Sequence, residues 1–181
     1  MSVFNIEGFR SALTAGGARP NQFQVILNYP PYVASSDPRA SSFLVTTAEL
    51  PGSSVPPAPV FYRGRQVNFA GDRVFAPWAV TVLNDAGLIV RTALEQWMNG
   101  MDALQSKRGL TQPTSYIADL TVQQLDRNGV ISKTYILRDA FPVEIGPVAL
   151  DFSANDQISN FQVSFIYQYF VTDFVPANGV V

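Results

Sequence analysis

The chain has 181 residues, a net charge of −2 and only 14% charged side chains, against about 25% in typical soluble domains. It contains no cysteine and no histidine, which excludes disulfides, thiolate nucleophiles, zinc sites built from those residues and any serine–histidine–aspartate triad. No apolar run approaches the ~20 residues needed to cross a bilayer, so we expect no membrane span. The length suits a single domain over residues 1–181.

Residues 1–20 are predicted to form an N-terminal arm with a helical turn or two over 6–13, ended at Gly16-Gly17. The first strand is expected over 21–29, where Phe23, Val25, Leu27 and Tyr29 alternate with polar residues. The proline-, serine- and aspartate-rich run 30–42 indicates a loop. A second strand is expected from Phe43 to Leu50.

Residues 50–75 have the composition of a projecting hairpin. Pro51-Gly52 ends the preceding strand, and three further prolines keep the chain extended. Short strands over 60–62 and 66–69 flank Arg63-Gly64-Arg65, the expected tip, and residues 70–73 form a second turn. An alternating strand follows from Trp78 to Leu83.

One helix is predicted over residues 86–106, capped by Asn84 or Asp85 and ended near Gly109. Its apolar side chains recur at helical spacing and predict one broad buried face, formed by Ile89, Val90, Ala93, Leu94, Trp97, Met98, Met101 and Leu104.

The remaining chain reads as strands. A strand over 116–125 is joined to one over 130–137 by Asp126-Arg127-Asn128-Gly129, a strong hairpin signal. Residues 141–145 continue extended, the last strand spans 158–170, and 171–181 form a C-terminal arm. One face of the last strand is expected to carry Phe161, Val163, Phe165, Tyr167 and Tyr169. The predicted fold is mainly β: an antiparallel β-sandwich or barrel of seven to eight strands with one packed α-helix and extended arms and loops.

Few residues suggest chemistry. The segment from Asp126 to Gly129 resembles part of a calcium loop but lacks the closing glutamate, so a turn is expected. The spacing of Asp119, Asp151 and Asp156 does not support a carboxylate pair, and Ser132 and Lys133 point to opposite faces of a strand. We therefore expect no catalytic residue, no metal site and no cofactor.

Four stretches, in order and spanning 18–170, resemble the tail tube proteins of contractile-tailed bacteriophages. They are Ala18-Arg19-Pro20-Asn21-Gln22-Phe23-Gln24-Val25; Phe69-Ala70-Gly71-Asp72-Arg73 with Trp78 and Val82-Leu83-Asn84-Asp85; Arg91-Thr92-Ala93-Leu94-Glu95 with Trp97-Met98-Asn99-Gly100; and Gln124-Leu125-Asp126-Arg127-Asn128-Gly129 with Phe141-Pro142, Leu150-Asp151, Asn155-Asp156 and Phe161-Gln162-Val163.

The resemblance implies a structural protein of the virion tail, related in fold to secretion-system tube proteins and assembled in the cytoplasm of the host bacterium. It implies a homo-oligomer of six-membered rings stacked into the inner tail tube, surrounded by a contractile sheath. A tape measure protein would occupy the lumen during assembly, baseplate and tail terminator proteins would bind the two ends, and double-stranded DNA would pass through on ejection. No enzymatic activity is implied.

The same resemblance implies that residues 50–75 form the hairpin that contacts the next ring. The interface residues expected there are Phe61, Tyr62, Arg63, Arg65, Gly71, Asp72 and Arg73, since aromatic residues and arginine are enriched at interface centres. Within the same fold, a tube-initiating baseplate protein or a secretion-system tube protein is an alternative, and the phage-type motifs favour the former of these two. From another class, the alternative is a monomeric β-sandwich carbohydrate-binding module on a virion or cell surface.

Overall fold

A computed structural model describes residues 6–13, 17–34 and 37–173, and its main feature is one antiparallel sheet of seven strands. Six follow the order β1 (Phe23–Leu27), β8 (Ala118–Leu125), β9 (Ile131–Ile145), β10 (Asn160–Ile166), β7 (Trp78–Leu83) and β2 (Val45–Ala48). The seventh, β11 (Tyr169–Thr172), also pairs with β9. The predicted helix end at Gly16 and the ends of both arms lie outside the described residues.

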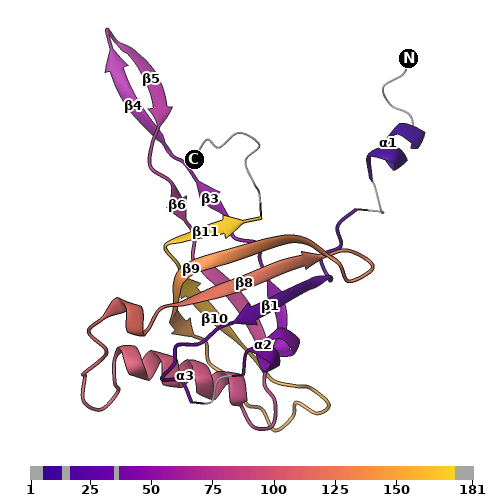
Figure 1. The fold of residues 1–181 in the computed structure, drawn as a ribbon, viewed down its shortest axis with the longest axis vertical. Coiled ribbons are helices and arrows are strands. Elements are labelled where there is room, and N and C mark those ends of the chain that lie inside the picture. Colours follow the sequence, from indigo (N-terminus) through magenta and orange to yellow (C-terminus); the bar gives the residue numbers. More distant parts are fainter. Residues whose placement is uncertain (1–5, 14–16, 35–36, 174–181) are drawn as a thin grey trace.

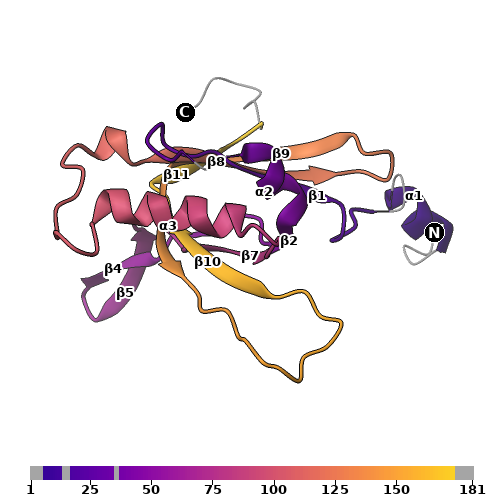
Figure 2. The same ribbon diagram turned by 90° about the horizontal axis from the view of Figure 1, so that it is seen from below.

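Strand β9 joins two layers because different partners pair with its two halves. Its first half pairs with β8 and β11, and its second half, from Phe141 to Ile145, pairs with β10. In Figure 2, β1, β8 and β9 form one layer, and β7 and β10 form the other. Along the described strands the pairing runs as an open path from β1 to β2. The fold is therefore mainly β and antiparallel, as predicted, and takes the sandwich form rather than a closed barrel.

The core lies between the two layers and follows the predicted alternation. Strand β7 buries Trp78, Val80 and Val82, and the facing layer supplies Leu120 and Val122. The other core side chains on strands include Val25, Leu27, Leu137, Phe161, Val163 and Phe165. Each fully buried aliphatic or aromatic side chain stabilises the fold by about 1.5–3 kcal/mol, so the sandwich carries the stability of the chain.

Helix α3 (Ile89–Met101) covers the open side of the sandwich (Figure 2). Its buried residues are Val90, Ala93, Leu94 and Trp97, which lie on the predicted face. Trp97 is fully buried, and its indole N–H donates a hydrogen bond to the carbonyl of Tyr116 at 2.6 Å. The predicted cap at Asn84 or Asp85 is wrong, because α3 begins at Ile89 and its N-cap is Leu88. Asp85 still supports the start of the helix, since its carboxylate accepts from the backbone N–H of Ile89 at 2.9 Å.

The predicted loop over 30–42 is wrong in its second half, where helix α2 (Pro38–Leu44) forms. Asp37 caps this helix by accepting from the backbone N–H of Arg39 at 2.9 Å, and Pro38 suits the first turn. The buried hydroxyl of Ser41 accepts from the Leu27 N–H at 3.1 Å, which ties α2 to the edge of β1. Strand β2 consequently begins at Val45, not at Phe43.

Three predicted core positions are also wrong. Ile89, the first residue of α3, is 44% exposed. Leu104 is exposed because α3 ends at Met101, short of the predicted Gly109. Tyr169 is exposed because the predicted last strand is interrupted at residues 167–168, which transfers the inward position of β11 to the partly buried Phe170.

The predicted helical turns near the N-terminus are present as α1 (Ile6–Ala12), which buries none of its residues. Among the described residues, no helix combines the length and apolar character that crossing a membrane requires.

Candidate functional site

Residues 53–75 project from the sandwich as a narrow two-stranded ribbon, which we call the arm (Figure 1). Its outer part pairs β4 (Pro57–Tyr62) with β5 (Arg65–Ala70), and its inner part pairs β3 (Ser53–Ser54) with β6 (Val74–Phe75). Every residue of β4 and β5 is exposed. The outer strands of the arm therefore contribute no side chain to the core.

The tip of the arm is a two-residue turn at Arg63-Gly64. Both residues have positive φ, 48° and 80°, as a type I′ hairpin turn requires. This confirms the predicted tip. The Arg63 guanidinium lies 5.4 Å from the centre of the Tyr62 ring, a cation–π arrangement that leaves a cation and an aromatic side chain together at the outermost point.

One face of the arm is apolar and unpartnered. Val60 lies opposite Val67, Ala58 opposite Phe69, and Tyr62 opposite Arg65. Side chains of directly opposed residues share a face of a sheet, and alternation along each strand puts these three pairs on the same face. Arg65 carries the only charge among the six side chains. All six residues are exposed. An isolated hairpin is at best marginally stable in water, and this face is a surface that a partner would cover.

The arm is anchored at its base by aromatic packing. The ring centre of Phe75 lies 5.7 Å from that of Tyr167 and 5.6 Å from that of Phe170. Arg73 donates to the hydroxyl of Ser53 at 3.3 Å, across the β3–β6 pair. The ribbon thus leaves the sandwich from a rigid attachment.

The seven residues predicted as an interface fall into two groups. Phe61, Tyr62, Arg63 and Arg65 lie at the tip, with the side chains of Phe61 and Tyr62 on opposite faces. Gly71, Asp72 and Arg73 lie in the stem, where the Gly71 N–H donates to the Pro56 carbonyl at 2.8 Å. The ion pairs Arg91–Glu95 and Asp119–Arg138 both lie outside the arm.

Two acidic residues considered above as candidate site residues, Asp126 and Asp119, have structural roles. The Asp126 carboxylate accepts from the N–H groups of Asn128 at 2.7 Å and Val130 at 2.8 Å, which forms the predicted turn. Asp119 is paired with Arg138. In the part of the chain that the structure describes, no three acidic residues are grouped so that they could hold a metal ion.

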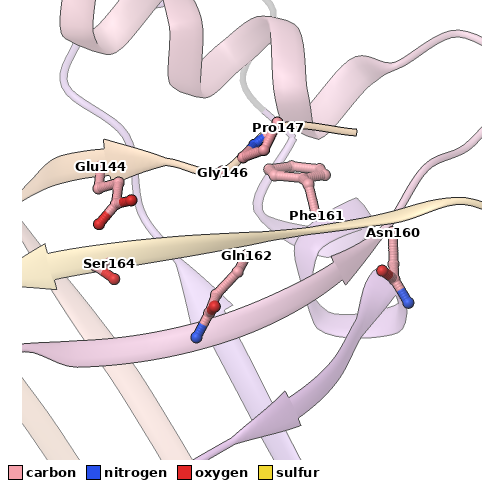
Figure 3. Close-up of a pocket in the computed structure, with 7 residues that line it drawn as sticks. All are labelled: Glu144, Gly146, Pro147, Asn160, Phe161, Gln162 and Ser164. Carbon is pink, nitrogen blue, oxygen red and sulfur yellow. The ribbon is translucent and has the colours of Figure 1, made fainter. Parts of the chain in front are cut away.

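The outer face of β10 is polar and without a cation over Asn160, Gln162 and Ser164, and it ends in the exposed Ile166. Figure 3 shows Gln162 on the opposite side of β10 from Phe161, which points toward Pro147. Asn160, Gln162 and Ser164 line a shallow cavity of about 300 Å³ together with Glu144. Phe161 is buried, so the strand separates an apolar core from an uncharged or acidic surface.

The fold and its projecting arm can be compared with known proteins. The family model described as phage tail tube protein matches residues 18–173. The chain belongs to the phage tail tube protein family. It is accordingly a structural component of a phage tail, and its role lies in the inner tube.

Two curated relatives agree with this family assignment. The tail tube protein of Serratia phage KSP90 is 29% identical over 171 residues, which is 93% of this chain and 97% of the relative. The tail tube protein of Enterobacteria phage T4 is 29% identical over 153 residues, 84% of this chain and 90% of the relative.

Solved structures show the same fold. A chain in the baseplate of the anti-feeding prophage has a TM-score of 0.61 and 16% identity, covering 86% of this chain and 94% of that one. A chain in the sheath–tube complex of an extracellular contractile injection system has a TM-score of 0.61 and 15% identity, covering 91% and 97%.

Sequence reasoning missed the apolar face of the arm, to which Val60, Val67 and Phe69 contribute. The signal was present, because apolar residues recur at alternate positions on both sides of Arg63-Gly64. Their common face becomes visible only when the two-residue turn fixes the register.

Proposed function

We propose that this tail tube protein forms six-membered rings that stack into a hollow tube, inside a contractile sheath, through which double-stranded DNA passes on ejection. The observation that carries the proposal is the arm. It is rigidly based, fully exposed along β4 and β5, and apolar on one face. A projecting surface of this kind contacting a different surface of the next copy generates an open-ended stack.

The open sheet supports ring formation. Strands β1 and β2 end the pairing path among the described strands, and edge strands tend to pair with strands of another chain. Pairing between neighbouring subunits around a ring removes such edges by closure. In the arm, by contrast, Pro57 and Pro59 lack N–H groups along β4, and prolines of this kind discourage edge pairing.

The polar outer face of β10 is a surface of the kind that a lumen for DNA needs. It offers Asn160, Gln162 and Ser164 beside Glu144, and no lysine or arginine lines its cavity. Cationic side chains would bind phosphates and slow the passage of DNA. Uncharged and acidic groups would let it slide.

The partners proposed are those of a tail. The related structures include a sheath–tube complex, a baseplate and a tube-terminating cap, and we extend sheath, baseplate and terminator contacts to this protein, with a tape measure protein in the lumen. Assembly is proposed to occur in the host cytoplasm. The role is structural and not enzymatic. The family match over residues 18–173 favours the tube over the carbohydrate-binding module.

Cryo-electron microscopy of the purified protein at high concentration, with and without baseplate-bearing seeds, tests the proposal. Hollow sixfold rings or stacked tubes are expected. Monomers alone, even with seeds, would overturn it, and binding on a glycan array by those monomers would support the surface module instead.

A further inference from the structure

The loop over residues 146–159, which joins β9 to β10, exposes apolar side chains at the end of the molecule opposite the arm (Figure 1). Leu150 and Ile158 are 89% and 69% exposed, and Phe152 is completely exposed. A hollow of about 340 Å³ on this loop is lined by residues that include Leu150, Asp151 and Ile158. Contiguous exposed apolar surface of this kind marks an interaction site.

The arm and the 146–159 loop carry opposite charge. The arm holds Arg63, Arg65 and Arg73 against one acidic residue, Asp72. The 146–159 loop holds two acidic residues, Asp151 and Asp156, and no lysine or arginine. Asp151 is anchored within its loop, since its carboxylate accepts from the N–H of Ser153 at 2.9 Å.

We propose that the arm of one subunit docks on the 146–159 loop of a subunit in the next ring. Arg63 and Arg65 would then face Asp151 and Asp156, and the apolar face beside Tyr62 would cover the exposed side chains of the loop. This proposal rests on the stacking function proposed above and names its acceptor surface.

The geometry favours a second copy as the occupant. Arm and loop lie at opposite ends of the long axis (Figure 1), so one subunit cannot satisfy its own arm, whereas translation along that axis brings unlike ends together. Complementary charge then fixes register and excludes the arm-to-arm contact, which would oppose arginines. The apolar side chains at the centre supply the affinity, and aromatic residues and arginine are the types that dominate such centres.

The absence of cysteine from the chain allows a direct test by crosslinking. In the variant Q66C/A154C, one thiol lies near the tip, on the arm face that carries Phe61, and the other lies on the loop. Treating assembled tubes with a bis-maleimide whose span exceeds the thickness of the ribbon should give a ladder of multimers on denaturing gels, because each subunit joins the next. The matched control Q66C/S132C moves the second thiol to an exposed position at the start of β9 and should give no ladder.

A charge exchange provides an independent test. The variants R63E/R65E and D151R/D156R should each lower tube yield at least about tenfold, since opposing like charges across an interface costs several kcal/mol. The combined variant should restore tubes. All the altered side chains are exposed, so thermal unfolding of each variant should match that of the wild type.

The outcomes separate the two proposals. If the wild type forms tubes but Q66C/A154C gives no ladder and the charge variants assemble normally, the docking proposal is overturned and the tube stands. Crosslinks to sheath or baseplate protein in place of a ladder also overturn it. If the wild type forms neither rings nor tubes with seeds, the proposed function itself fails.

Discussion

Replacing Gly71 by alanine should disable the arm and leave the sandwich intact. The N–H of Gly71 donates to the Pro56 carbonyl at 2.8 Å, where the two legs of the arm meet. A Cβ atom at position 71 would lie 2.5 Å from that same oxygen, roughly 1 Å closer than the ordinary separation of non-bonded heavy atoms. Since the oxygen belongs to the backbone, the two legs must separate.

The magnitude follows from what the separation breaks. Losing the hydrogen bond costs about 0.5–1.5 kcal/mol net, which lowers the population of the ordered arm about two- to twelvefold. An isolated hairpin has little stability to lose. The core should be unaffected, because β4 and β5 bury no residue.

We therefore expect G71A to form rings but to yield several-fold fewer tubes than the wild type by electron microscopy, with an unchanged unfolding temperature. The matched control is G52A, because no atom lies within 4 Å of the Cβ position at Gly52. Tubes of normal yield from G71A would refute the reasoning about the arm. A fall in unfolding temperature comparable to that of a core variant would refute the claim that the arm is independent of the core.

Three further predictions concern the sandwich and the loop. S41A should destabilise the protein by about 1–3 kcal/mol in urea unfolding, since it leaves a buried β1 amide without an acceptor, whereas S42A on the exposed side of α2 should change stability by less than about 0.5 kcal/mol. W97F should cost about 1–3 kcal/mol by removing the donor to the Tyr116 carbonyl; wild-type stability would contradict the importance of this bond. The backbone N–H and the hydroxyl of Ser153 donate to the Asp151 carboxylate and lower its pKa. The turn that these bonds form should be fully stabilised above about pH 4 and should loosen as the pH falls through the lowered pKa. An NMR titration of the Ser153 amide that stayed flat to about pH 2 would contradict this.

Strong periodicity made much of the fold predictable. Strand β7 and the first part of β10 alternate as read, because one face of each packs on the core and the other does not. Helix α2 was not predicted, because its seven residues form no apolar stripe. Its stability comes from the Asp37 cap and from the bond that Ser41 makes to a distant strand, and the second of these is a tertiary contact that local sequence cannot show.

The candidate site was predictable in position but not in shape. Composition placed a hairpin tip at Arg63, and the structure has a two-residue turn there. The apolar face depends on register, which pairs Val60 with Val67. The exposure of Leu150 and Phe152 could not be predicted, because the sequence of a loop between two buried strands does not show how far the loop projects from them.

In the proposed tube, the separation of core from arm would make stacking weak for each contact and strong for each ring. An isolated two-stranded hairpin is at best marginally stable in water, so docking of the arm as proposed would carry an entropic cost and keep the affinity of a single arm-to-loop contact low. In the six-membered ring proposed here, engaging one arm raises the effective concentration of the others, and the combined affinity exceeds that of any single contact without new chemistry. Free subunits would then dock poorly, whereas a completed ring would offer a full set of acceptor loops. The proposal therefore predicts growth from a preformed ring rather than random association, and a tube with a defined starting point.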